Sequence, residues 1–161
     1  RSTFAMPDVR VDGTPGGMLA LAKELASSRP GPEVWIHAAA VLDYFQEPID
    51  GKKPSGEGDW TLTLSQGPKH ISELSEFTEG AYRIGFKLEV DSSEDDLIKR
   101  SLEQISRYGV DAVIANNLND LKDRNSPRCR IVMPDGNFSV ILDQISMCEA
   151  IESLVSLHDP R

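Results

Sequence analysis

Three polar side chains stand at points where strands of a sheet would end. Asp43 follows one apolar run, Lys87 stands at the end of a second, and Asn116 follows a third. If these runs are parallel strands of one sheet, their carboxyl ends share the edge where ligands of α/β proteins bind. A carboxylate, an ammonium and an amide at this edge could accept from a hydroxyl, attract an anion and hydrogen-bond a sugar or an amide. The spacing predicts a single ligand crevice.

Each residue also has an ordinary structural interpretation. Asp43 could be a turn residue and Asn116 a loop starter, because short polar side chains often satisfy nearby backbone groups. The coincidence of all three at strand ends favours the crevice.

A loop over residues 46–59 offers a second source of positive charge. It contains two prolines and three glycines, with Lys52 and Lys53 in the middle, a composition typical of an exposed, mobile loop. Such a loop could close over a phosphate, or the lysines could simply be solvated. The sequence contains no GxGxxG or Walker-type phosphate loop, so motifs alone indicate no nucleotide site.

The cysteines and histidines point to neither a metal nor a nucleophile. His37, His70 and His158 have no second ligand at a recognisable metal spacing, and we predict no metal site. Two cysteines, Cys129 and Cys148, fit reduced thiols in the cytoplasm better than a disulfide framework.

Helices and strands alternate in the elements that would hold these residues. We predict helices that begin at Pro15 after a Thr14 cap, at Pro68, after a Ser93 cap with an end at Gly109, and after an Asp143 cap. We predict strands over residues 8–12, 33–41, 60–65, 82–90, 111–115, 128–133 and 137–142, with 38–41 as the buried part of a central strand. The last two strands flank a Pro-Asp-Gly turn and form a hairpin. The fold class is α/β: a three-layer, Rossmann-like, mostly parallel sheet with a C-terminal antiparallel hairpin.

Size and charge restrict the functional classes. The chain has 161 residues, about one domain, and 17 basic against 26 acidic residues give a net charge of −9. This charge argues against broad contact with nucleic acid or an anionic membrane. No apolar stretch reaches the roughly 18 residues that span a bilayer. The first residue is Arg1 and no signal segment follows, so we expect the chain to begin inside a longer product.

Five segments carry a resemblance to a known family. In order, they are AAAVLDYF, GKKPSG, TLTLSQGPKHI, IGFKLEVD and VDAVIANN. From about Val9 to the C-terminus the chain resembles phosphopantothenoylcysteine synthetase, the ligase of coenzyme A biosynthesis. The whole chain is then a single nucleotide-binding, synthetase-like domain. The resemblance implies that the family's usual N-terminal strand–helix units, roughly the first third of that domain, are missing from it.

The resemblance implies a two-step condensation. The carboxylate of 4′-phosphopantothenate attacks the α-phosphate of CTP or ATP, with Mg²⁺ on the phosphates, and the amine of L-cysteine then displaces the nucleotide. It also implies a homodimer, for which the hairpin 128–142 is the candidate pairing surface, and a possible fusion to a flavin-dependent decarboxylase.

The resemblance also assigns roles to residues. It gives catalytic roles to two residues, Lys52 and Asn116, and nucleotide-binding roles to Ala39, Ala40, Asp43, Phe86, Lys87 and Tyr108. The small alanines would leave room for the base or ribose, Phe86 would pack against the nucleotide, and the lysines would reach phosphate.

The chain departs from the family pattern just before the predicted strand over residues 111–115. Many bacterial members carry two lysines where this chain has Gln104 and Tyr108, which leaves the choice between CTP and ATP open. Arg107 and Lys99 are possible substitutes, at different helical phases. Two other functions remain: a Rossmann-like module that binds nucleotide without turnover, and an α/β oligomerisation domain.

Overall fold

The computed structural model describes residues 10–28, 30–46, 50–51, 55–56, 58–123 and 125–158. The elements in chain order are α1 (Pro15–Ala26), β1 (Val34–His37), β2 (Tyr44–Phe45), β3 (Ser65–Gln66), α2 (His70–Glu73), η1 (Glu76–Thr78), β4 (Tyr82–Glu89), α3 (Glu94–Tyr108), β5 (Ala112–Asn117), η2 (Asp120–Lys122), β6 (Cys129–Val132), β7 (Phe138–Ile141) and α4 (Gln144–Ser156). No helix in these ranges is long and apolar enough to cross a membrane.

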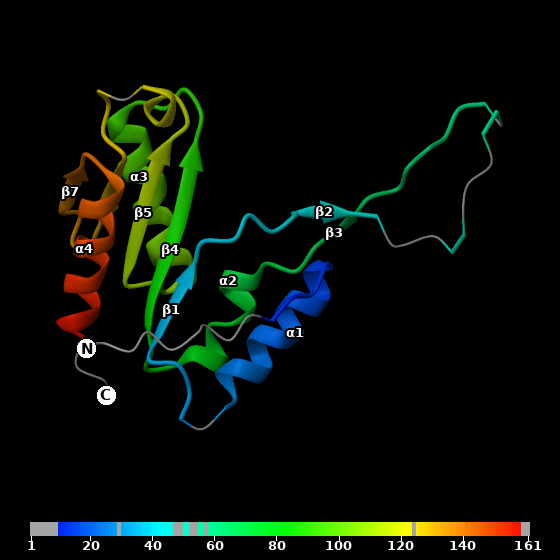
Figure 1. Cartoon of the computed structure of the whole chain (residues 1–161), viewed down its shortest axis with the longest axis horizontal. Coiled ribbons are helices and arrows are strands. Elements are labelled where there is room, and N and C mark those ends of the chain that lie inside the picture. Colours follow the sequence, from blue (N-terminus) through cyan, green and yellow to red (C-terminus); the bar gives the residue numbers. More distant parts are fainter. Residues whose placement is uncertain are drawn as a thin grey trace.

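The main sheet has the order β1-β4-β5-β6-β7 (Figure 1). Strands β1, β4 and β5 run parallel, with Ile36 beside Ile84 and Ile84 beside Ala112. Strands β6 and β7 are antiparallel to their neighbours, as the Pro-Asp-Gly turn predicts. The mostly parallel sheet with a C-terminal hairpin is confirmed.

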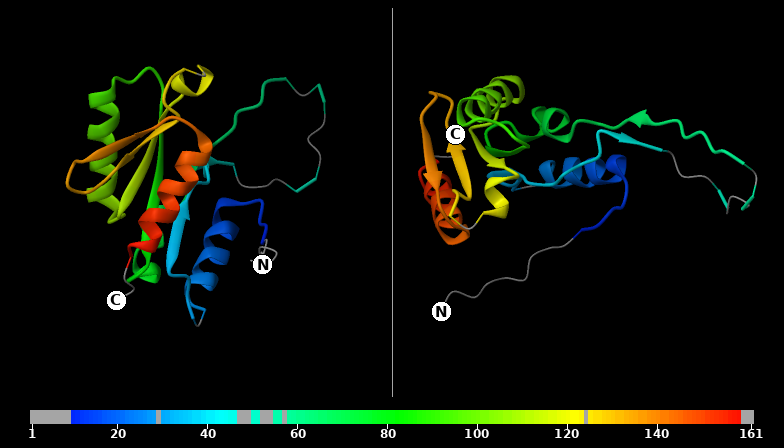
Figure 2. Two further views of the ribbon diagram at one scale, coloured as in Figure 1. Left: turned by 60° about the vertical axis from the view of Figure 1, so that its left-hand side comes forward. Right: turned by 90° about the horizontal axis from the view of Figure 1, so that it is seen from above.

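Helices cover both faces of this sheet (Figure 2). The α3 face has a buried cluster of Leu97, Ile105, Val110, Val113, Ala115 and Val132. The α4 face has a second cluster of Tyr82, Ile84, Ile114, Cys129 and Ile131, against which α4 packs Met147, Ile151 and Leu154. The predicted three layers are therefore present.

The helix signals in the sequence act as expected. The side chain of Thr14 caps α1, that of Ser93 accepts from the Asp96 amide at 3.1 Å, and that of Asp143 accepts from the Ser146 amide at 2.9 Å. Gly109 ends α3 in the left-handed region, at φ 61°. The helix predicted from Pro68 is shorter than its apolar spacing suggests and divides into α2 and η1.

The prediction of a central strand over residues 33–41 is wrong in two respects. Strand β1 ends at His37 and, among the described residues, pairs only with β4, so it lies at the edge of the sheet. Ala38, Ala39 and Ala40 follow it as exposed loop. Alanines have little side chain to bury and a low preference for strands, so an apolar run of this composition does not require pairing.

The strand predicted over residues 60–65 is also mostly irregular. Only Ser65–Gln66 pairs, with Tyr44–Phe45, and the two form a ribbon outside the main sheet. Residues 42–46 and 58–67, here called the arm, extend away from the body of the molecule (Figures 1 and 2). The predicted strand over 8–12 forms no strand at residues 10–12, and its first part lies outside the described residues.

Arg83 connects the elements on the α3 side. Its side chain is buried, and its guanidinium donates to the carbonyl oxygens of Tyr108, at 2.7 Å, and Ile71. Its backbone amide donates to the Asp111 carboxylate at 2.7 Å. One side chain on β4 thus connects the end of α3 to α2, and these elements form the walls of the candidate site.

Candidate functional site

A cavity of about 510 Å³ opens at the carboxyl ends of β1 and β4. Its walls come from α1, β1 and the loop after it, residues 68–74, β4 and α3. Six of the predicted site residues line it: Ala39, Ala40, Asp43, Phe86, Lys87 and Tyr108. The structure therefore brings together residues that are up to 69 positions apart, at the edge of the sheet where the sequence predicts a crevice.

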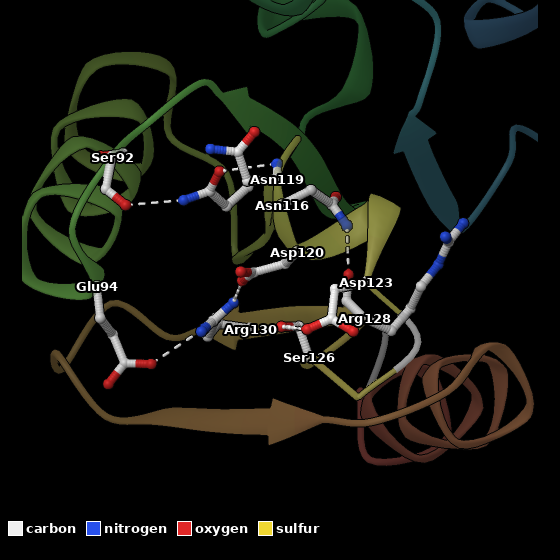
Figure 3. A network of polar contacts seen from close by, with 10 residues as sticks. Ser92, Glu94, Asn116, Asn119, Asp120, Asp123, Ser126, Arg128 and Arg130 are labelled. Carbon is white, nitrogen blue, oxygen red and sulfur yellow. Dashed lines mark hydrogen bonds and ion pairs between the residues drawn. The ribbon is translucent and has the colours of Figure 1, made fainter.

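The two residues predicted to be catalytic are placed differently. Lys52, like Lys53, lies outside the described residues. Asn116 lies inside β5, one residue before its end, whereas the prediction placed it just after the strand, and it does not line the cavity. Its Nδ2 donates to the Arg128 carbonyl oxygen at 2.8 Å, so it connects β5 to the start of β6 (Figure 3).

Phe86 faces two environments. It lines the cavity at the end of β4, and it also packs against the buried cluster on the α4 face. Its carbonyl oxygen accepts from the Gln104 side chain at 3.3 Å. Packing of this ring against a nucleotide therefore stays a prediction.

The charge of the cavity is opposite to that of the chain. Four of its lining side chains are cationic, namely Lys69, Lys87, Arg100 and Arg107, and two are acidic, namely Asp43 and Glu103. The whole chain carries a net charge of −9. A local cationic excess in an acidic protein favours a small anionic ligand at this place.

Three of the four cations form ion pairs, one of them with an exposed carboxylate and two with a largely buried one. Lys69 Nζ lies 2.9 Å from Asp43 Oδ1, and both side chains are more than half exposed, so salt screens this pair. Glu89 pairs with Lys87 at 2.9 Å and with Arg100 at 3.0 Å, and its side chain is only 15% exposed. The hydrogen bond from Lys87, aided by the charges of Lys87 and Arg100, lowers the pKa of Glu89.

His37 contributes a neutral ring to the cavity wall. Burial, together with the charges of Arg83 and His70, lowers the pKa of His37 to about 4. Its Nε2 is buried and has no hydrogen-bond partner among the residues that the structure describes. His70 in the same wall lies 2.7 Å from the Pro15 carbonyl oxygen through Nε2, which joins α2 to α1. At neutral pH His37 is therefore a polar, uncharged group in the site.

Sequence reasoning missed Arg100 and Glu103 on α3. With Gln104 and Arg107, which the sequence singles out, they line the cavity at the i, i+3, i+4 and i+7 spacing of one helix face. Of the two proposed substitutes for the family lysines, Arg107 lines the cavity, whereas Lys99 lines a groove beside Phe138. The helical spacing is the signal that identifies Arg100.

Next to Asn116, a polar network holds the loops that follow β4 and β5 (Figure 3). Arg130 donates to Glu94 at 3.1 Å and also pairs with Asp120. Asn117 donates to the Ser92 carbonyl oxygen at 2.7 Å. These contacts connect the start of α3 to η2 and β6, which fixes α3 against the sheet.

Comparison with known proteins gives consistent matches. Residues 16–144 match the family described as DNA/pantothenate metabolism flavoprotein C-terminal domain. The coenzyme A biosynthesis bifunctional protein CoaBC of Thermococcus kodakarensis is 34% identical over 123 residues, which are 76% of this chain and 30% of that protein. Phosphopantothenate–cysteine ligase 1 of Arabidopsis thaliana is 37% identical over 93 residues, which are 55% of this chain and 29% of that protein. The chain thus spans about a third or less of the curated relatives that it matches.

Solved structures share the fold. The DNA/pantothenate metabolism flavoprotein from Streptococcus pneumoniae aligns with a TM-score of 0.69 at 23% identity, over 90% of this chain and 72% of that one. A Cab2 mutant in complex with phosphopantothenate-cysteine aligns with a TM-score of 0.57 at 23% identity, over 88% of this chain and 48% of that one. With the family match over most of its length, the chain belongs to the DNA/pantothenate metabolism flavoprotein C-terminal domain family.

Proposed function

We propose that this chain carries the nucleotide-binding part of a phosphopantothenate–cysteine ligase of coenzyme A biosynthesis. The observation that carries the proposal is the cation-lined cavity at the carboxyl ends of β1 and β4, which gathers six residues that the family pattern singles out. Relatives named as this ligase, and a structural neighbour that holds phosphopantothenate-cysteine, support the choice of reaction.

The reaction has two steps. A carboxylate oxygen of 4′-phosphopantothenate attacks the α-phosphorus of CTP or ATP, and pyrophosphate leaves. The amine of L-cysteine then attacks the acyl carbon, the nucleoside monophosphate leaves, and the amine loses a proton. Both steps need aligned reactants and neutralised phosphate charge more than a strong nucleophile, which suits a cavity lined with lysine, arginine and small residues.

We assign the roles as follows. Ala39 and Ala40 leave room for the base or ribose, Asp43 accepts from a ribose hydroxyl, and Lys87 contacts phosphate. Phe86 and Tyr108 border the nucleotide. Lys52 reaches phosphate from the loop, and Asn116 closes the site near the base.

Mg²⁺ would enter with the nucleotide and supply charge neutralisation on its phosphates. In the part of the chain that the structure describes, no group of three or more His, Cys, Asp or Glu side chains converges on a point that could hold a metal ion. The chain offers the ion no ligand cage there.

We further propose a cytoplasmic homodimer that works with, or is fused to, a flavin-dependent decarboxylase. The name bifunctional in the CoaBC relatives supports the second activity. The hairpin of β6 and β7 remains our candidate pairing surface, because Phe138 and Val140 on β7 are each more than 40% exposed.

The direct test is pyrophosphate release by the protein in its full reading frame. Release should require both 4′-phosphopantothenate and a nucleoside triphosphate, and comparison of CTP with ATP would identify the nucleotide. Nucleotide binding without release would support the non-catalytic module, and neither binding nor release would support the oligomerisation domain.

A further inference from the structure

Glu89 places one carboxylate between two cations of the cavity. Its Oε1 lies 2.9 Å from Lys87 Nζ and its Oε2 lies 3.0 Å from Arg100 Nη1. Both cations line the cavity, whereas Glu89 does not. The carboxylate therefore contacts both cations without itself lining the cavity.

This arrangement differs from the other ion pair at the site. The side chains of Lys69 and Asp43 are 55% and 68% exposed, so water competes for both. Glu89 is 15% exposed, and the pKa of its carboxyl is lowered by the hydrogen bond from Lys87 and by the two cations. It stays ionised well below neutral pH and pairs with both cations, of which the Lys87 side chain is 31% and the Arg100 side chain 55% exposed.

The backbone at Glu89 is also held. Its carbonyl oxygen accepts from the Leu118 amide at 2.8 Å, and β4 pairs with β5 as far as Glu89 and Asn117. Arg100 stands on α3, whose start is fixed by the pair of Arg130 and Glu94. The carboxylate and both cations thus come from elements with fixed positions, and such a clamp loses little freedom when an anion binds.

We infer that Glu89 is a positioning residue, which orients Lys87 and Arg100 as a two-cation clamp for the polyphosphate of the nucleotide. This rests on the proposed function, because it takes the cavity to be the nucleotide site. It adds Arg100 as a phosphate contact and assigns to Glu89 a role that involves no contact with the ligand.

Two effects of Glu89 on an anion have opposite signs, and this makes the inference testable. Its negative charge weakens the attraction of the cavity for phosphate. Its hydrogen bonds hold the two cations at fixed places, which strengthens binding. If the first effect dominated, Glu89 would merely balance charge, and its removal would tighten binding.

The experiment is calorimetric titration of the folded protein with tripolyphosphate, and separately with CTP and with ATP. Tripolyphosphate isolates the clamp from contacts to base and ribose. We expect Glu89→Gln to weaken binding of tripolyphosphate and of the bound nucleotide about tenfold, although it makes the cavity more positive. Unchanged or tighter binding would overturn the inference.

Matched variants on α3 complete the test. Arg100→Lys keeps the charge and loses the planar fork, and it should weaken binding nearly as much as Arg100→Gln. Lys99→Gln, one position away and facing the other groove, should leave binding unchanged. The double variant Glu89→Gln with Arg100→Gln should lose less than the sum of the two, because the residues act together.

The outcomes separate the two proposals. If the unaltered protein binds neither tripolyphosphate nor a nucleotide, the proposed function and the clamp fail together. If it binds both and the Glu89 and Arg100 variants bind equally well, only the clamp fails. If Glu89→Gln loses its cooperative thermal transition, the clamp is tested with the two Arg100 variants instead. Tripolyphosphate binding by Arg100→Lys that equals that of the unaltered protein would then overturn the clamp.

Discussion

His37 shows how a single side chain can make stability depend on pH. The pKa of its imidazole is about 4 in the folded chain, against an ordinary value of 6.5. As the pH falls below 6.5, His37 binds a proton in the unfolded chain but not yet in the folded chain, so the free energy of unfolding decreases towards pH 4. Below pH 4 His37 is protonated in both states, so the loss of stability from this residue is complete and no longer changes with pH.

We therefore predict that the free energy of unfolding falls between pH 6.5 and pH 4, and that His37→Phe removes this part of the slope. The phenyl ring keeps a flat shape beside Trp35, on which His37 stacks with 6.4 Å between ring centroids. Urea unfolding at four pH values measures the difference. Parallel curves for the two proteins would show that His37 does not titrate as its surroundings imply.

Lys52 is best tested against its neighbour. Charge-assisted hydrogen bonds to phosphate are worth about 1.5–3 kcal/mol, so Lys52→Ala should weaken nucleotide binding about tenfold or more and reduce its dependence on salt. Lys53→Ala should change both much less, since the family pattern assigns no role to Lys53. Equal effects of the two variants would mean that the loop contributes only general charge.

Asn116 is expected to affect stability as well as activity. Asn116→Ala leaves the Arg128 carbonyl oxygen without its 2.8 Å donor, which should lower the free energy of unfolding by about 1 kcal/mol. If Asn116 also closes the site near the base, pyrophosphate release falls further than the folded fraction does. Denaturant unfolding and release, measured on the same preparation, separate the two losses.

At the scale of elements, α3 shows what patterning can predict. Its cap, its end and its core face agree with the sequence, since Leu97, Ile98, Leu102 and Ile105 repeat at helical spacing between Ser93 and Gly109. The loop after β1 and the arm could not be predicted, because a short apolar run has the same composition in a buried strand and in an exposed segment. The sequence predicts that a ligand site lies at the carboxyl-terminal edge of the sheet, and the cavity opens there. The sequence does not show which face of α3 meets that edge, so Arg100 could not be assigned to the site from the sequence.

The packing of α3 gives an element-scale prediction. Leu97 is 1% exposed and belongs to the buried cluster, so Leu97→Ala should cost about 2–5 kcal/mol of unfolding free energy. The same substitution at Leu157, which is 83% exposed, should change it by less than about 0.5 kcal/mol. Similar losses at both positions would mean that α3 does not pack against the sheet as described.

At the scale of the whole molecule, the proposed homodimer requires a surface on which two copies pair. Exposed apolar side chains occur on the β7 hairpin, where Val140 is 46% exposed, and on the arm, where Leu62 is 50% exposed. We predict that the protein sediments as a dimer and that Val140→Arg produces monomers, because a charge in an apolar interface lacks a partner. Leu62→Arg is the matched comparison, and monomers from that variant alone would move the interface to the arm.

The position of α3 has one more consequence. The helix packs one face into the core cluster and lines the cavity with another, so the residues proposed to bind a ligand and those that hold the fold share one backbone. A ligand at 100 times its dissociation constant would add about 2.7 kcal/mol to the folded state. Amide hydrogen exchange along this helix should slow accordingly, so occupancy of the site can be followed without any turnover.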